Sequence, residues 1–136
     1  MKPGSLLITG VTGFVGRHLL SVPAARRYRI FGAGRSRPSQ KNRLSNLAGF
    51  YVGNLCDASF ANRLIQTVKP DVIIHLAGRH ASSARASRQA REFLSDNVVA
   101  PNRLLSAAAR FSPKARNVIV GSSAEYGVSH SIRRRF

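Results

Sequence analysis

The sequence has few cysteines, few acidic residues and no tryptophan. Its 136 residues include one cysteine, Cys56, and five acidic residues against 22 lysines and arginines. A single cysteine excludes a disulfide within the chain, and no group of Cys and His residues has the spacing of a zinc site. We therefore expect a protein of a reducing cytoplasm, without a structural metal.

Long apolar runs are also missing. No run approaches the roughly 20 residues that a membrane helix requires. Lys2 precedes an apolar stretch, but three glycines interrupt that stretch and no small-residue cleavage site is evident, which argues against a signal peptide. With 43% hydrophobic residues, the chain has enough apolar material for the core of one domain. We expect it to be soluble, with no membrane partner.

The shortage of acidic residues gives a formal net charge of +17. Such an excess attracts polyanions in general, whether nucleic acid, anionic lipid or a phosphorylated small molecule. The basic residues are scattered, and no basic helix carries interleaved aromatic residues. The charge therefore predicts no specific nucleic-acid partner.

What the chain does contain is an alternation of apolar patterns. Buried-strand patterns occur in "SLLIT", "YRIFGAG", "FYVG", "DVIIHLAG" and "NVIVGSS", at residues 5–9, 28–34, 50–53, 71–78 and 117–123. Helical spacing occurs at residues 14–22, 57–68 and 97–111. Alternating strands and helices predict an α/β fold: a parallel sheet with right-handed crossovers and helices on both faces.

Local signals bound the predicted helices. Pro23 limits the first helix, and Pro70 lies beyond the end of the second. Either Asp57 or Ser59 is available as the N-cap of the second helix. In the third helix, Pro101 either introduces a kink or marks the first turn of the regular part.

Three glycines follow the first predicted strand, in "TGVTGFVG". Gly10, Gly13 and Gly16 stand between a buried strand and an amphipathic helix, which is the context that a dinucleotide-binding turn demands. The first glycine would allow the tight turn, the second a close approach to a pyrophosphate, and the third close packing of the helix. The spacing is Gly-x-x-Gly-x-x-Gly, and the alternative is a flexible loop without a special role.

Five stretches, taken in order, carry a family resemblance: "TGVTGFVG", "GNLCD", "PDVIIHLAG", "NVVAPNRLLSAA" and "VIVGSSAEYG". They make the chain similar to the N-terminal part of the extended short-chain dehydrogenase/reductase family, the NAD(P)-dependent epimerases, dehydratases and reductases of nucleotide sugars. The resemblance implies a Rossmann-like, doubly wound parallel sheet over residues 1–127, incomplete at its C-terminal end. Residues 128–136 form a basic tail without a clear pattern.

The same resemblance assigns cofactor-binding roles. Around the pyrophosphate it places Gly10, Gly13, Phe14, Val15 and Gly16. It places Asn54 and Leu55 beside the adenine, where the family usually has Asp-Leu, and it places Asn97 near the cofactor. Leu76, Ala77 and Gly78 would line the cofactor cleft, although plain core packing is an equal alternative for Leu76.

The end of the second strand bears on the choice of cofactor. An NAD enzyme would place an acidic residue there, about 20 residues after the glycine turn, to hold the ribose 2′-hydroxyl. The sequence instead has Arg35, Ser36 and Arg37, without a carboxylate. Arginines that can bind a 2′-phosphate favour NADP over NAD, although composition alone could place an arginine there in so basic a chain.

The family's catalytic elements are only partly present. By resemblance, Ser122 matches the substrate-binding serine, with Ser123 as the alternative, and Glu125 lies near the dehydratase acid; for Glu125 an exposed turn carboxylate is the better interpretation. The family's Tyr-x-x-x-Lys is absent, since no tyrosine in the chain is followed by a lysine four residues later. His75 could substitute as an acid, but its place in a buried strand favours a packed histidine.

Two functions therefore remain open. The first is the cofactor-binding part of a nucleotide-sugar epimerase, dehydratase or reductase, similar to GDP-4-keto-6-deoxymannose reductase, in a chain that is truncated and inactive alone. The second is a non-catalytic NADP-binding module or sensor. An incomplete sheet would expose an apolar edge, through which two copies could pair as a homodimer.

Overall fold

The computed structural model describes residues 3–38, 44, 46–79 and 86–121. Five strands form one sheet in the order β3-β2-β1-β4-β5, and all neighbouring strands run parallel. The strands are β1 (Gly4–Thr9), β2 (Tyr28–Gly34), β3 (Leu47–Val52), β4 (Val72–His75) and β5 (Arg116–Ile119). This order confirms the predicted Rossmann-like α/β fold.

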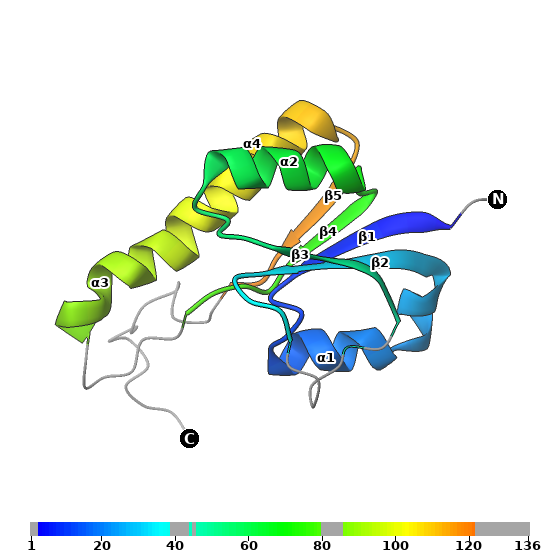
Figure 1. The fold of residues 1–136 in the computed structure, drawn as a ribbon, viewed down its shortest axis with the longest axis horizontal. Helices are drawn as coiled ribbons and strands as arrows, with labels where there is room; N and C mark the ends of the chain where they lie inside the picture. The colour runs from blue at the N-terminus through cyan, green and yellow to red at the C-terminus, as the bar shows by residue number, and fades with distance from the viewer. Residues whose placement is uncertain (1–2, 39–43, 45, 80–85, 122–136) are drawn as a thin grey trace, which may run out of the picture.

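Helices cover both faces of the sheet. They are α1 (Phe14–Ser21), the 3₁₀-helix η1 (Pro23–Arg27), α2 (Ala58–Val68), α3 (Ala86–Leu94), the π-helix η3 (Ser95–Val99) and α4 (Ala100–Phe111). Figure 1 shows α1 on one side of the sheet and α2 with α4 on the other. The crossovers therefore place helices on both faces of the sheet, as the sequence pattern predicted.

The central strand β1 supplies both layers of the core. Leu6 and Ile8 join the cluster on the α1 side, whereas Leu7 joins the cluster on the side of α2 and α4. All three are at most 3% exposed. A strand covered on both faces needs apolar residues at successive positions, which explains the uninterrupted run in the sequence.

The fourth strand is shorter than predicted. His75 pairs with Thr9 at the last register position between β1 and β4. Immediately after Thr9 the chain turns at Gly10, so Leu76–Gly78 have no further strand residue beside them, although the Leu76 N–H still donates to the Thr9 carbonyl over 3.0 Å. The residues predicted to end the strand therefore leave the sheet.

Helix boundaries follow from local chemistry. Asp57 is the N-cap of α2, and its Oδ1 accepts a hydrogen bond from the Ser59 N–H at 2.8 Å, which decides between the two predicted caps. That backbone bond is the main reason why the pKa of Asp57 lies below its ordinary value. None of the helices within the described residues combines the length and apolar character needed to cross a membrane.

Pro101 stands in the first turn of α4, as one of the two alternatives predicted. Proline lacks an N–H and its ring collides with the carbonyl four residues earlier, so a regular helix cannot run through it unchanged. The preceding turn is wider here: the Ala100 N–H donates to the Ser95 carbonyl, five residues back. The resulting π-helix carries Asp96, which lines a cavity, and Asn97, which is hydrogen-bonded to the Arg79 backbone.

Candidate functional site

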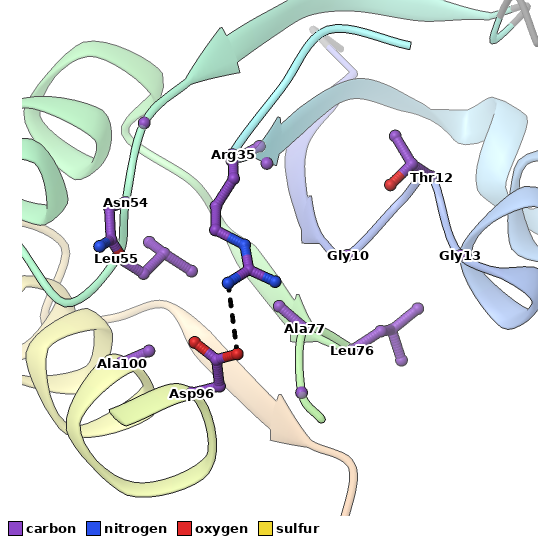
Figure 2. A pocket seen from close by; sticks show the side chains of 14 residues that line it. Gly10, Thr12, Gly13, Arg35, Asn54, Leu55, Leu76, Ala77, Asp96 and Ala100 are labelled. Atoms are coloured by element: carbon purple, nitrogen blue, oxygen red, sulfur yellow. Dashed lines mark hydrogen bonds and ion pairs between the residues drawn. The ribbon is translucent and has the colours of Figure 1, made fainter. Parts of the chain in front are cut away.

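A cavity of about 250 Å³ opens where the strands end. Figure 2 shows side chains from several of these strand ends facing it. Its lining consists of Gly10, Thr12, Gly13, Ala33, Gly34, Arg35, Gly53, Asn54, Leu55, Leu76, Ala77, Gly78, Asp96 and Ala100. Open parallel sheets bind ligands at the carboxyl ends of their strands, where the strand order reverses, and in this sheet it reverses beside β1.

Gly10 makes the turn that opens the cavity. Its φ is +71°, and a Cβ there would lie 2.6 Å from the backbone nitrogen of Ala77. Gly16 has a different constraint, because its Cβ would lie 2.5 Å from the Cα of Val11. The first glycine thus allows a left-handed turn against the end of β4, and the third lets α1 pack directly on the loop.

Gly13 is the N-cap of α1 and lines the cavity. The first N–H groups of a helix lack acceptors within the helix, so the start of α1 presents donors beside this glycine. Phe14 and Val15, which we expected around a pyrophosphate, are 78% and 57% exposed and are not among the lining residues. Thr12 lines the cavity instead, and its place between the first two glycines was the signal that could have identified it.

Asn54 and Leu55 reach the cavity from the end of β3. The Asn54 Oδ1 accepts from the Cys56 N–H at 3.0 Å, which fixes the side chain in a local turn. Leu55 is 8% exposed and belongs to the core under α2. At this end of the cavity, an amide and an apolar side chain therefore lie side by side.

Leu76, Ala77 and Gly78 form the opposite wall. Leu76 also packs against the core on the α1 side, so it both lines the cavity and contributes to packing. Asn97 does not line the cavity but holds this wall: its Oδ1 accepts from the Arg79 N–H at 2.9 Å and its Nδ2 donates to the Arg79 carbonyl at 2.8 Å. Asn97 thus positions the segment that follows β4.

Arg35 is the cation of the cavity lining. Its Nη1 lies 3.3 Å from the Asp96 Oδ2, across the cavity in Figure 2. Ser36 and Arg37, the other two residues predicted at the 2′-position, are exposed and do not line the cavity. Sequence reasoning missed Asp96, although an acidic residue next to Asn97 is a notable feature in a chain with only five.

The three catalytic candidates, Ser122, Ser123 and Glu125, lie outside the described residues. His75 is 3% exposed, and its Nδ1 lies 2.6 Å from the Thr9 Oγ1. Its Nε2 is buried and has no hydrogen-bond partner among the described residues. Burial lowers the pKa of His75, which favours a neutral, packed histidine as predicted.

This burial predicts a pH dependence of stability. On unfolding, His75 regains its ordinary pKa of 6.5, so below that pH the unfolded chain binds the extra proton more readily than the folded one. We expect the free energy of unfolding to fall below pH 6.5, by at most about 1.4 kcal/mol per pH unit. Thermal unfolding of the wild type and of His75→Gln between pH 7.5 and 5.5 measures this loss of stability. If the stability of the two proteins fell in parallel with pH, the result would contradict the prediction.

The sequence model of the NAD dependent epimerase/dehydratase family matches residues 6–135. The chain belongs to this family. The match begins within β1 and includes the glycine turn and the other four described strands, in agreement with the resemblance seen in the sequence.

Two curated relatives illustrate the breadth of the epimerase/dehydratase family match. Methionine adenosyltransferase 2 subunit beta of Xenopus tropicalis is 36% identical over 104 residues, covering 76% of this chain and 28% of that protein. GDP-mannose 4,6 dehydratase 2 of Caenorhabditis elegans is 30% identical over 137 residues, covering 89% of this chain and 35% of that protein. The chain spans about a third of the length of these two relatives.

Solved structures share the fold of this family member. WbmH of Bordetella bronchiseptica, solved in complex with NAD+, superposes with a TM-score of 0.75 at 22% sequence identity. The superposition covers 94% of this chain and 42% of that chain. At this identity the likeness shows the Rossmann-like fold.

Proposed function

We propose that the chain binds a nicotinamide dinucleotide in the cavity at the strand ends, with NADP preferred over NAD. The observation that carries this proposal is the pairing of a left-handed glycine turn at Gly10 with Arg35 on the wall of the same cavity. Gly10, Gly13 and the start of α1 would hold the pyrophosphate on backbone N–H groups. Asn54 and Leu55 would contact the adenine, and Arg35 the ribose 2′-phosphate.

The residues present fit such a group. A Cβ at Gly10 would lie 2.6 Å from the backbone nitrogen of Ala77, so only glycine lets the turn approach the cavity wall this closely. The described wall has no carboxylate at the end of β2, where an NAD-specific site would hold one. When bound, a nicotinamide cofactor supplies the hydride chemistry that the family's name implies.

We further propose that the chain is the cofactor-binding part, over residues 1–127, of a nucleotide-sugar epimerase, dehydratase or reductase. The likeness to GDP-mannose 4,6 dehydratase 2 supports a GDP-sugar as the substrate. The proposal includes the cytoplasmic location and the homodimer expected from the sequence. Size-exclusion chromatography of the purified chain tests the homodimer.

The second candidate is a dinucleotide-binding module without catalysis. It is favoured by one observation: none of the three tyrosines in the 136 residues is followed by a lysine four positions later. The lysine of that pair would lower the tyrosine pKa so that it could transfer a proton near neutral pH.

One experiment tests both proposals. The purified chain is titrated with NADPH and with NADH by fluorescence, and then incubated with NADP and GDP-mannose to detect turnover. We expect NADPH to bind more tightly than NADH, without turnover of the sugar. Turnover favours the enzyme, binding without turnover fits both the module and a cofactor-binding part that is inactive alone, and failure to bind either dinucleotide contradicts both.

Gly13→Ala tests the pyrophosphate position. The φ of Gly13 is −73°, which any residue adopts, and its Cβ would meet only the Gly10 carbonyl oxygen at 3.2 Å. The fold should therefore survive, while the added methyl group narrows the approach of the phosphates. We expect NADPH affinity to fall by roughly threefold to tenfold. Unchanged affinity would place the pyrophosphate elsewhere.

A further inference from the structure

The Arg35 side chain spans the cavity and ends at a carboxylate on the far wall. It starts at the end of β2, and its Nη1 reaches the Asp96 Oδ2 on η3 at 3.3 Å. In Figure 2 the guanidinium group lies between Asn54 and Leu55 on one side and Ala77 and Leu76 on the other. The cation that would meet a 2′-phosphate is thus already paired within the protein.

Asp96 is held independently of Arg35. Its Oδ2 also accepts from the Arg79 Nε at 3.0 Å, and the Arg79 Nη1 lies 2.7 Å from the Glu92 Oε2 on α3. Asn97 fixes the Arg79 backbone through two hydrogen bonds. The Asp96 side chain is only 17% exposed, whereas that of Arg35 is 64% exposed, so the arginine is the partner with room to move.

We propose that Asp96 is a specificity-determining residue of the dinucleotide site, because its carboxylate competes with the cofactor's 2′-phosphate for Arg35. This inference rests on the proposed dinucleotide binding. NADP must exchange the Arg35–Asp96 pair for an Arg35–phosphate pair, so part of the new interaction is offset by the one that is lost. NAD carries a 2′-hydroxyl in place of the phosphate and gains little from Arg35. Asp96 therefore narrows the preference for NADP.

The size of the effect follows from the exposure of the pair. Solvent screens an ion pair whose arginine is mostly exposed, and such pairs contribute about 0.2–1 kcal/mol. Removing the Asp96 carboxylate should thus raise NADPH affinity by roughly twofold to fivefold. NADH affinity should change by less than a factor of about 1.5, because NADH has no 2′-phosphate to contact Arg35.

The experiment is a double-mutant cycle on the full chain. NADPH and NADH affinities are measured by fluorescence for the wild type, Asp96→Asn, Arg35→Ala and the double variant. We expect Asp96→Asn to raise the ratio of NADPH to NADH affinity, and we expect it to have no effect on that ratio in the Arg35→Ala background. An equal gain for both cofactors, a gain that persists without Arg35, or no gain would overturn the proposal.

Two further variants control for charge and folding. Glu92→Gln makes the same charge change within the network but does not touch Arg35, so the ratio should stay at the wild-type value. Asp96→Ser repeats the removal of the carboxylate and is used if circular dichroism shows that Asp96→Asn misfolds. If the wild type binds neither dinucleotide, the proposed function is wrong and this inference is wrong with it. If the wild type binds a dinucleotide but the ratio of NADPH to NADH affinity does not change in the Asp96 variants, only this inference is wrong.

Discussion

Replacing Gly10 with alanine is expected to destabilise the fold by about 3 kcal/mol or more. A left-handed conformation costs a residue with a Cβ about 1–2 kcal/mol. The alanine Cβ would also lie 2.6 Å from the Ala77 nitrogen and 2.7 Å from the Leu76 carbonyl carbon. These are backbone atoms of the cavity wall, held by the hydrogen bond from the Leu76 N–H to Thr9. Urea unfolding followed by circular dichroism measures the loss.

Gly13→Ala is the matched control for this variant. It makes the same chemical change three residues later in the same turn, at a φ of −73° that alanine adopts readily. Because only one atom, the Gly10 carbonyl oxygen, lies close to the added Cβ, the cost should stay below about 1 kcal/mol. Equal costs for the two variants would show that the left-handed turn and the contact with Ala77 do not constrain Gly10.

Much of this fold could be predicted from the sequence because its signals are local. The residues Leu6–Ile8 are apolar at every position, as a strand buried on both faces requires, and the structure buries all three. Asp57 carries the short acceptor that a helix N-terminus needs, and it caps α2. Pro23 ends α1 because it cannot continue a helix.

Predictions became less accurate where a neighbouring strand decides the outcome. The apolar run from Asp71 to Gly78 predicts a strand to its end, but β4 stops at His75 because β1 turns away at Gly10. The residues of β4 themselves do not indicate where β1 turns. Strand length in a sheet depends on the partner as much as on the residues of the strand itself.

The lining of the cavity was likewise predictable only where local sequence determines it. The glycines and Leu76–Gly78 could be located from the sequence, because they directly follow strands. The sequence offered Arg35, Ser36 and Arg37 equally, and only the three-dimensional arrangement brings Arg35 alone of these to the cavity wall. Asp96 meets Arg35 from 61 positions away, on a π-helix that the sequence did not predict, although Pro101 marked the irregular start of α4.

Arg35→Ala is expected to lower NADPH affinity by roughly tenfold or more. Hydrogen bonds to a charged group contribute about 1.5–3 kcal/mol, and alanine removes every donor that the guanidinium offers to a 2′-phosphate. NADH has no 2′-phosphate, so its affinity should change by less than about threefold. The preference between the two cofactors, measured by fluorescence titration of each, should therefore shrink or disappear.

The control for Arg35→Ala must remove one positive charge without touching the cavity, because a chain with a formal net charge of +17 attracts any anion. Arg116 is exposed at the amino end of β5, whereas the cavity lies at the carboxyl ends of the strands. Arg116→Ala should lower both affinities slightly and equally, leaving their ratio unchanged. Equal losses of NADPH affinity in the two variants would mean that overall charge, and not the position of Arg35, sets the preference for the phosphorylated cofactor.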